Sequence, residues 1–428
     1  MREQTTAAHT RTVLIGASLP RSGHHFLERL LARLFGPRLH YCEWYTPPGC
    51  CRAIPCTRGG PGAVVFQKNH DWQSDMPQDR PAALHVVQFR HPVPQALSDR
   101  ELVLADLPGR AGRPHRHSAE EHLAWLAFHA DYVRRFHDRW AASGPPNAFR
   151  LPYERLQADP AAALAGLCAA AGLRVPAEAI ATAAETTRDR KPVGLRRTWQ
   201  DHAPRELATS RAFDPELHGA YEAWLLPRVP AFGYDRLLPA GRYEGHPLHG
   251  LLLLADATAP LPPGCTDRLD TARALAGPHP LIEMQFAERD LAAGDPAAAW
   301  RRLADAAARW PFWAPLWPAL LQVAPLAGET LPADLITPDA LLTLTGAPET
   351  LPALAERLCA EDRPTEAVAA AALALAFLPE DAAAARAAAH RARAEAWTLL
   401  SRPDRAAADT AAAARLHPAG AGPALATA

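Results

Sequence analysis

The sequence predicts an α/β domain, a parallel sheet flanked by helices, followed by an all-α domain of helical repeats. Up to about residue 240, short apolar runs alternate with amphipathic helical segments, which is typical of a parallel sheet covered on both faces. From about residue 280, Ala- and Leu-rich helical segments follow one another without strand-like runs. A chain of 428 residues is also too long for one ordinary core. We therefore expect an α/β domain over 11–240, a connector over 241–279 and a helical domain over 280–428.

The elements of the first domain follow from the spacing of its apolar residues. We expect four short apolar runs to be strands: Val13–Ala17, Ala63–Gln67, Leu84–Phe89 and Phe149–Tyr153. The first helix carries apolar residues at helical spacing from Phe26 to Phe35, and Gly36-Pro37 ends it. Further helices are expected from Pro92 through Leu104, over Glu120–Trp140, and after Asp159-Pro160, where a capping aspartate precedes a first-turn proline.

The composition excludes several classes of protein. Forty-five basic against 46 acidic residues give a net charge of −1, which argues against nucleic acid or an anionic membrane as a partner. The first ten residues are polar, and the longest apolar run, Ala367 to Leu378, is too short to span a bilayer. We expect a cytoplasmic protein with no membrane span.

The turn between the first strand and the first helix predicts an anion site. It reads Ser18-Leu19-Pro20-Arg21-Ser22-Gly23-His24-His25. A glycine-containing turn in this position directs backbone N–H groups at one point, where the helix dipole also favours an anion. The NTPase pattern G-x-x-x-x-G-K-[ST] is absent, because His24 follows Gly23 and the cation, Arg21, precedes the glycine by two residues. The sequence therefore predicts a phosphate-binding turn of the P-loop type that lacks the NTPase lysine.

This turn resembles the loop with which sulfotransferases bind the 5′-phosphosulfate of 3′-phosphoadenosine-5′-phosphosulfate (PAPS). That loop has the pattern P-[KR]-S-G, followed by two polar residues and an aromatic one. Three further motifs of that family follow in order: Lys68-Asn69-His70 after the second strand, Arg90 with Ser98 eight residues later, and Leu151-Pro152-Tyr153-Glu154-Arg155-Leu156 before Asp159-Pro160. The resemblance spans roughly residues 11–236. It implies PAPS as co-substrate, adenosine 3′,5′-bisphosphate as product, and no metal in the reaction.

The resemblance also implies roles for individual residues. Sulfuryl transfer is an in-line displacement, so a cation must stand beside the leaving phosphate, and Arg21 and Lys68 are the candidates. A neutral imidazole suits removal of the acceptor's proton, and His70 is the candidate base, with His24 or His25 as rivals. The expected donor-binding residues are Arg21, Ser22, Gly23, His24, His25, Phe26, Arg90, Ser98, Tyr153, Arg190 and Lys191. Phe26 and Tyr153 could each either contact the adenine ring of the donor or pack in the hydrophobic core.

Two features depart from the pattern of the family. His24 and His25 stand where hydroxyl residues are usual, so at least one side-chain hydroxyl contact to phosphate is lost. The R-K-G motif that precedes G-D-W is degraded, and Arg190-Lys191 and Arg196-Arg197 compete for its role at the 3′-phosphate. We favour Arg190-Lys191.

The second domain contains a repeat of 25 residues. Its units are 287–311, 355–379 and 394–418, each with a polar turn in the middle and a proline at the end. The first two units start 68 residues apart, twice the 34-residue period of tetratricopeptide repeats, which they resemble. Leu321 to Thr350 fits the pattern poorly. A repeat domain of this kind offers a surface for a protein partner.

The sequence supports two interpretations from different classes. The first is a PAPS-dependent sulfotransferase with a C-terminal repeat domain. The second is a tetratricopeptide-type interaction scaffold whose nucleotide-binding domain is degenerate and inactive, in keeping with His24-His25 and the altered R-K-G motif. The acceptor is not identified by the sequence: it is a hydroxyl or amine of a glycan, a peptide or a small molecule.

Two loops are expected to form the acceptor pocket. Leu107–Ser118 is basic, which suits either an acidic acceptor, such as a charged glycan or an acidic peptide, or a solvated charge run. Tyr41–Pro61 contains Cys42, Cys50, Cys51 and Cys56, without the paired C-x-x-C spacing of a zinc ribbon. We expect reduced thiols there, with a structural zinc ion or a local disulfide as the alternatives.

Overall fold

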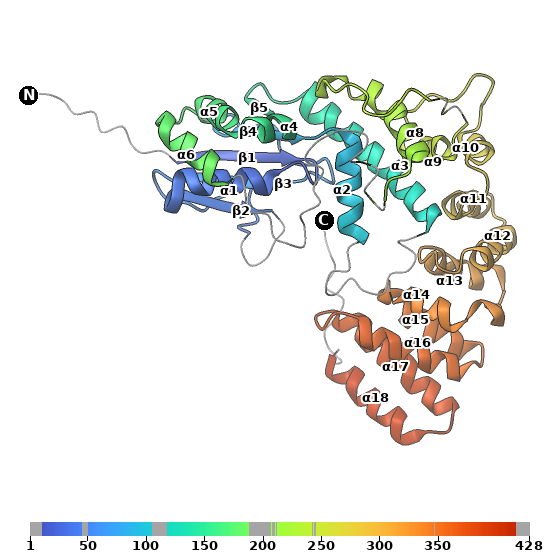
Figure 1. The fold of residues 1–428 in the computed structure, drawn as a ribbon. Coiled ribbons are helices and arrows are strands. Elements are labelled where there is room, and N and C mark those ends of the chain that lie inside the picture. Colours follow the sequence, from blue (N-terminus) through green and yellow to red (C-terminus); the bar gives the residue numbers. More distant parts are fainter. Residues whose placement is uncertain are drawn as a thin grey trace, which may run out of the picture. The chain divides into compact units, whose positions relative to one another are not determined.

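The structure is a computed structural model that describes residues 11–44, 50–104, 118–187, 207, 210, 212–241, 243, 245–345 and 347–416. The chain divides into two compact units. The α/β unit consists of Met1–Val103 and Leu126–Asp256, and the helical unit consists of Leu104–Trp125 and Ala257–Ala428. All the labelled strands belong to the first unit (Figure 1). The domain boundaries expected at residues 240 and 280 stay a prediction.

Five parallel strands form the sheet of the α/β unit, in the order β2-β3-β1-β4-β5. They are β1 (Thr12–Ser18), β2 (Leu39–Glu43), β3 (Val64–Asn69), β4 (Leu84–Phe89) and β5 (Ala148–Pro152). The parallel sheet and four of its strands confirm the sequence prediction. The edge strand β2 was not predicted, because Cys42 is its one fully buried residue and it therefore lacks an apolar run.

The helices that lie wholly or mostly in the α/β unit carry labels from α1 to α9 (Figure 1). They are α1 (His24–Phe35), α2 (Pro92–Leu104), α3 (Ala119–Phe136), α4 (Tyr153–Ala158), α5 (Pro160–Ala170), α6 (Ala177–Thr187), α8 (Pro215–Leu225) and α9 (Pro247–Ala255). Apolar residues of α1, such as Leu27 and Leu30, share one buried core with Leu14 of β1 and Phe66 of β3. The Asp159 carboxylate caps α5 by accepting the N–H of Ala162 at 2.9 Å, as the sequence predicted.

The helical unit consists of successive helices without strands among its described residues (Figure 1). They are α10 (Arg268–Ala276), α11 (Pro280–Ala292), α12 (Pro296–Arg309), α13 (Leu316–Ala327), α14 (Pro338–Leu344), α15 (Leu351–Ala360), α16 (Pro364–Phe377), α17 (Ala383–Leu399) and α18 (Pro403–Leu416). The three predicted repeat units fall on the hairpins α11–α12, α15–α16 and α17–α18. Gly294, Asp362 and Ser401, one in each hairpin turn, all have positive φ, at 81°, 56° and 56°. The all-α character is confirmed, and the tetratricopeptide relationship stays a prediction.

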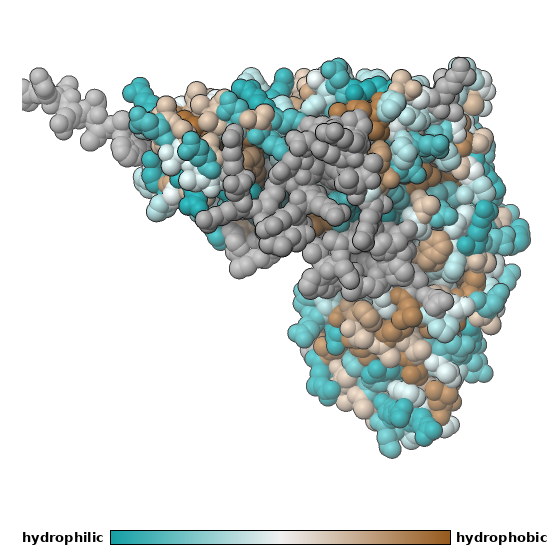
Figure 2. Space-filling view, viewed as in Figure 1, coloured by the Kyte–Doolittle hydropathy of each residue, from teal (hydrophilic) through white to brown (hydrophobic). Residues whose placement is uncertain are grey.

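The described surface is mostly polar. Figure 2 shows hydrophilic residues over much of the visible face, with apolar residues in scattered patches between them. Among the residues that the structure describes, no helix combines the length and the apolar character needed to cross a bilayer. One large apolar side chain of the α/β unit, Trp72, is 46% exposed and lies beside the candidate site described below.

Candidate active site

Three of the predicted motifs lie where adjacent strands end. The phosphate-binding turn follows β1, Lys68-Asn69-His70 completes β3, and Arg90 follows β4. β1 pairs with both β3 and β4, so the three carboxyl ends are neighbours at one edge of the sheet. Ligands of open parallel sheets bind beyond this edge.

The phosphate-binding turn, Leu19–Gly23, is held by its neighbours. The Leu19 N–H donates to the carbonyl of Gln88 at 3.0 Å, and the Gln95 side-chain amide donates to the carbonyl of Pro20 at 2.8 Å. Gly23 has a φ of 85°, and a Cβ at this position would lie 2.4 Å from the ring of Tyr153. Both the backbone conformation and the space therefore require glycine at the start of α1.

Arg21, Ser98 and Arg90 gather around this turn. The Arg21 Nε donates to the Ser98 hydroxyl at 3.1 Å. The Arg90 guanidinium is almost completely buried and lies 4.7 Å from the centre of the Tyr153 ring. Burial lowers the pKa of Arg90, and the neighbouring Tyr153 and Glu154 oppose that shift. Tyr153 is thus packed between Arg90 and Gly23, whereas Phe26 packs against the main core.

Two side chains of the turn are buried without a polar partner. The Ser22 hydroxyl and both ring nitrogens of His24 have no hydrogen-bond partner among the residues that the structure describes. Leaving such groups unpaired costs about 1–3 kcal/mol each, and native structures rarely do so. Burial lowers the pKa of His24 far below its usual value, and the positive charge of Lys68 adds to this effect, so its ring is neutral. A neutral ring and a hydroxyl are donors that phosphate oxygens would satisfy.

Lys68 lies in an ion pair that the sequence did not reveal. Its ammonium group donates to the carboxylate of Glu43, which is its register partner on β2. Burial of Glu43 opposes ionisation, but the hydrogen bond and the charge of Lys68 keep its pKa below the usual value. Glu43 was missed because β2 itself was missed. Lys68 is the one lysine among the residues that the structure describes, and it is 7% exposed. The ion pair holds it at the edge of the site.

His70 has a defined orientation and tautomer. Its Nδ1 lies 2.7 Å from the carbonyl oxygen of Ser18. Because a carbonyl oxygen can only accept, Nδ1 carries the proton and the lone pair is on Nε2. Burial lowers the pKa of His70 to about 4, and the charge of Lys68 contributes to the shift. The ring is therefore neutral at pH 7 and able to accept a proton.

The turn after His70 is fixed by residues distant in the sequence. The Tyr132 hydroxyl donates to the carbonyl of His70 at 2.5 Å. The buried Asp71 carboxylate accepts from Trp140 Nε1 at 2.8 Å and from Arg139 Nε at 2.9 Å. These contacts keep the imidazole at the carboxyl edge of the sheet.

An aromatic pair borders His70 on the exposed side. The rings of Trp72 and Tyr132 are stacked, with centroids 4.4 Å apart, and the Trp72 ring lies 5.8 Å from that of His70. The ring of His24 lies 5.1 Å from His70. His70 thus lies between the phosphate-binding turn and a partly exposed aromatic surface.

Comparison with known families agrees with this geometry. Residues 78–177 match the model of the sulfotransferase family. The matched segment, which includes β4 and β5, is thus similar to the sulfotransferase family. The matched segment contains Arg90, Ser98 and Tyr153, whereas the phosphate-binding turn and Lys68-Asn69-His70 precede it. The chain has no significant match among curated proteins.

Several of the expected site residues lie outside the described part of the chain. They are Arg190, Lys191, Arg196 and Arg197, together with residues 107–117 of the basic loop. Their roles at the 3′-phosphate and at the acceptor stay predictions.

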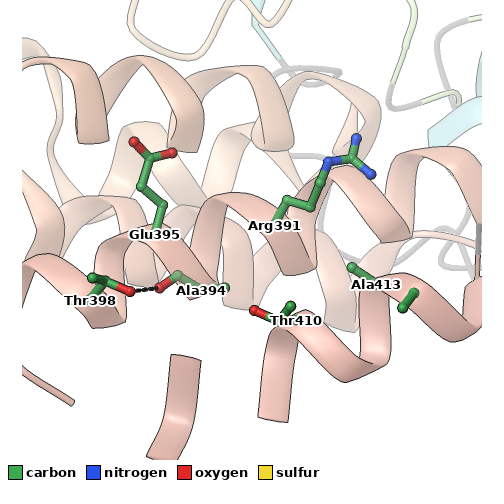
Figure 3. A pocket seen from close by; sticks show the side chains of 7 residues that line it. Arg391, Ala394, Glu395, Thr398, Thr410 and Ala413 are labelled. Atoms are coloured by element: carbon green, nitrogen blue, oxygen red, sulfur yellow. Dashed lines mark hydrogen bonds between the residues drawn. The ribbon is translucent and has the colours of Figure 1, made fainter. Parts of the chain in front are cut away.

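A separate pocket lies in the helical unit, away from every predicted site residue. It has a volume of about 440 Å³ and is lined by α17 and α18 residues: Arg391, Ala394, Glu395, Thr398, Thr410, Ala413 and Ala414. Figure 3 shows Thr398 turned to its own helix, where its hydroxyl donates to the carbonyl of Ala394 at 3.0 Å. The lining combines small side chains with one carboxylate and one guanidinium, and it lacks the buried cations of the candidate active site.

Proposed function

We propose that this protein transfers the sulfuryl group of PAPS to a hydroxyl or amine acceptor. One observation carries the proposal: cations and unpaired buried donors converge beyond three adjacent strand ends, in a chain with a segment that matches the sulfotransferase family. The cations are Arg21, Lys68 and Arg90, and the unpaired donors belong to Ser22 and His24. An anion carrying several phosphate oxygens matches this set better than a neutral ligand does.

The donor would be held at two ends. The turn Leu19–Gly23, with the first N–H groups of α1, suits the 5′-phosphosulfate. Arg90 and Ser98 suit the 3′-phosphate, as the family resemblance implies, and Arg21 joins the two groups through its hydrogen bond to Ser98. The residues present therefore fit PAPS, the group that supplies the sulfuryl moiety for transfer.

Side chains of the protein would take up the proton of the acceptor and stabilise the negative charge on the leaving phosphate. His70 Nε2 accepts the proton of the acceptor while the acceptor atom bonds to sulfur and the bond from sulfur to the phosphate oxygen breaks. Negative charge then develops on that phosphate oxygen, and Arg21 and Lys68 stabilise it. The ammonium of Lys68 has to turn from Glu43 toward the phosphate, so the ion pair keeps it oriented until the donor arrives.

Calorimetry with adenosine 3′,5′-bisphosphate tests the donor site, and ATP serves as the comparison ligand. We expect tight binding of the bisphosphate and weak binding of ATP. A screen of acceptors with labelled PAPS then tests transfer. Binding of neither nucleotide would favour the inactive scaffold, and binding without transfer to any acceptor class would leave a nucleotide-binding module instead of an enzyme.

The titration of His70 should respond to the donor product. In the free protein its pKa is lowered to about 4 by burial. A bound anion favours the imidazolium, so adenosine 3′,5′-bisphosphate should raise this pKa toward the ordinary value. NMR titration of the imidazole signals, assigned with a His70→Asn variant, measures the shift. An unchanged or lower pKa would place the bisphosphate away from His70.

Trp72 should contribute to acceptor binding. Its exposed ring, stacked on Tyr132 beside His70, offers a flat surface to an acceptor. Stacking is worth about 0.5–1.5 kcal/mol, so Trp72→Ala should raise the KM for the acceptor about two- to tenfold and leave the KM for PAPS unchanged. Trp72→Phe should recover part of the loss. Phe128→Ala, which removes another exposed aromatic ring of this unit, is the control. Equal effects of both alanine variants would contradict the assignment.

A further inference from the structure

Three cysteines converge beneath the edge of the sheet. The sulfur atoms of Cys42, Cys51 and Cys56 all lie within 4.8 Å of one another. Cys42 and Cys56 are fully buried, and Cys51 is half-buried. Cys42 lies on β2, whereas the other two belong to the following loop, so the fold brings them together where the sequence spacing gave no paired motif.

The separation of the sulfur atoms fits a shared ion better than a disulfide. Cys42 Sγ and Cys51 Sγ are 3.8 Å apart. Zn–S bonds of about 2.3 Å in a tetrahedral arrangement place two sulfur ligands about 3.8 Å apart. A disulfide requires about 2.05 Å and would use two of the three thiols, leaving a buried thiol beside it.

The loop of the cysteines is held by a buried glutamine. Gln67 of β3 is completely buried; its Oε1 accepts the N–H of Cys56 at 2.8 Å and its Nε2 donates to the carbonyl of Ala53 at 2.7 Å. One side chain therefore contacts both Ala53 and Cys56 and fixes this part of the loop against the sheet. Such outer contacts orient metal ligands in proteins.

A backbone N–H group also points at the adjacent cysteine, Cys50. The N–H of Arg52 donates to Cys50 Sγ at 3.2 Å. N–H donors stabilise the thiolate, which is the form of cysteine that binds metals.

The cluster is separate from the proposed catalytic groups. Cys42 pairs in register with Gln67, and the next pair is Glu43 with Lys68. Side chains alternate between the two faces of a strand, so the cysteine cluster and the Lys68–Glu43 ion pair lie on opposite faces of the sheet. An ion bound to the cysteines would fix the end of β2, and with it the position of Glu43, without touching the donor.

We propose that Cys42, Cys51 and Cys56 bind a thiophilic metal ion of the Zn²⁺ type in a structural role. Structural zinc ions usually have four ligands. Three thiolates would fill three of these positions, and a solvent molecule or the adjacent Cys50 would fill the fourth. The evidence for this site does not depend on the proposed sulfotransferase activity, because its ligands lie on the opposite face of the sheet from Lys68 and Glu43.

Metal titration of the full-length protein tests the proposal. The protein is reduced, stripped with a chelator, and titrated with Zn²⁺ against a chromophoric competitor and with Co²⁺ in an absorption spectrometer. We expect one ion per chain and a thiolate-to-cobalt charge-transfer band. Cys51→Ser, at the half-buried position, should weaken Zn²⁺ binding about 100-fold or more, because each ligand carries a large share of the binding free energy. Cys168→Ser and Cys359→Ser, at buried cysteines elsewhere, should bind as the parent protein does.

Other results would overturn the proposal. Reduced protein that gives no cobalt band has no thiolate metal site, and peptide mapping that links Cys42 to Cys51 in protein prepared without reductant would assign a disulfide instead. If circular dichroism shows that the Cys51→Ser variant is unfolded, the cobalt spectrum of the parent protein decides whether the metal site exists, because it reports thiolate ligands directly. Cys50→Ser then tests whether Cys50 is the fourth ligand.

Discussion

Replacing His70 with alanine should lower kcat by about 10² to 10⁴, the usual contribution of general acid–base catalysis. His70 presents Nε2 with a free lone pair because its Nδ1–H is donated to the carbonyl of Ser18. The ring is neutral at pH 7, since burial lowers its pKa to about 4. Initial rates with labelled PAPS and an identified acceptor measure the loss, and calorimetry should find the affinity for adenosine 3′,5′-bisphosphate nearly intact.

Two further variants separate catalysis from positioning. In His70→Asn the side-chain amide can still donate to Ser18 but cannot accept a proton, so this variant should be as slow as His70→Ala. His249→Ala, at a half-buried histidine of α9, is the matched control and should be fully active. Recovery of kcat in His70→Asn would show that the hydrogen bond to Ser18, and not proton transfer, is what His70 supplies. A near-normal kcat in His70→Ala would move the base elsewhere, whereas His24→Ala should weaken donor binding first.

Much of the α/β fold, including the glycine-containing turn after β1, could be predicted, because the signals are local. An apolar run, a glycine-containing turn and an amphipathic helix are each readable within about twenty residues. Adjacent parallel strands have their carboxyl ends at the same edge of the sheet, so no long-range signal in the sequence is needed to place them together. Arg21, Lys68 and Arg90 therefore lie at one edge, although nearly 70 residues separate the first from the last. The geometry of the motifs thus follows from the topology of the sheet.

The rest of the candidate site depends on pairings that no local pattern indicates. β2 is an edge strand of mixed polarity, so neither Glu43 nor its ion pair with Lys68 could be foreseen. The contacts of Asp71 with Arg139 and Trp140 span almost 70 residues and link two separate elements. The same holds for the stacking of Trp72 on Tyr132. These are side-chain contacts in three dimensions, and they fix the residues on either side of His70.

The ion pair of Lys68 changes how its role is understood. The sequence contains only one lysine besides Lys68, which is Lys191, and such a rare residue suggests a position that requires a compact ammonium. In the structure that ammonium already has an anionic partner, so a donor phosphate must compete with Glu43 for it. The guanidinium of Arg90 is buried against the ring of Tyr153, just after the end of β4. Because the family resemblance assigns Arg90 to the 3′-phosphate, its removal should weaken donor binding.

Replacing Arg90 with alanine should raise the KM for PAPS about ten- to a hundredfold and slow the chemical step much less. A charge-assisted hydrogen bond to phosphate is worth on the order of 1.5–3 kcal/mol, which corresponds to that change in affinity. Since Arg90 is buried, its truncation also removes packing against Tyr153, and the loss of contacts has to be separated from the loss of charge. Thermal unfolding of the variant measures the first contribution.

Two ligands separate the contributions at Arg90. Adenosine 3′,5′-bisphosphate and adenosine 5′-monophosphate differ only in the 3′-phosphate that Arg90 is proposed to hold. Arg90→Ala should weaken binding of the bisphosphate about ten- to a hundredfold and change binding of the monophosphate by less than about threefold. Arg90→Lys should retain part of the bisphosphate affinity, because it keeps the charge and loses the forked geometry of the guanidinium. An equal loss for both ligands would mean that Arg90 supports the phosphate-binding turn through Tyr153 and makes no contact with the 3′-phosphate.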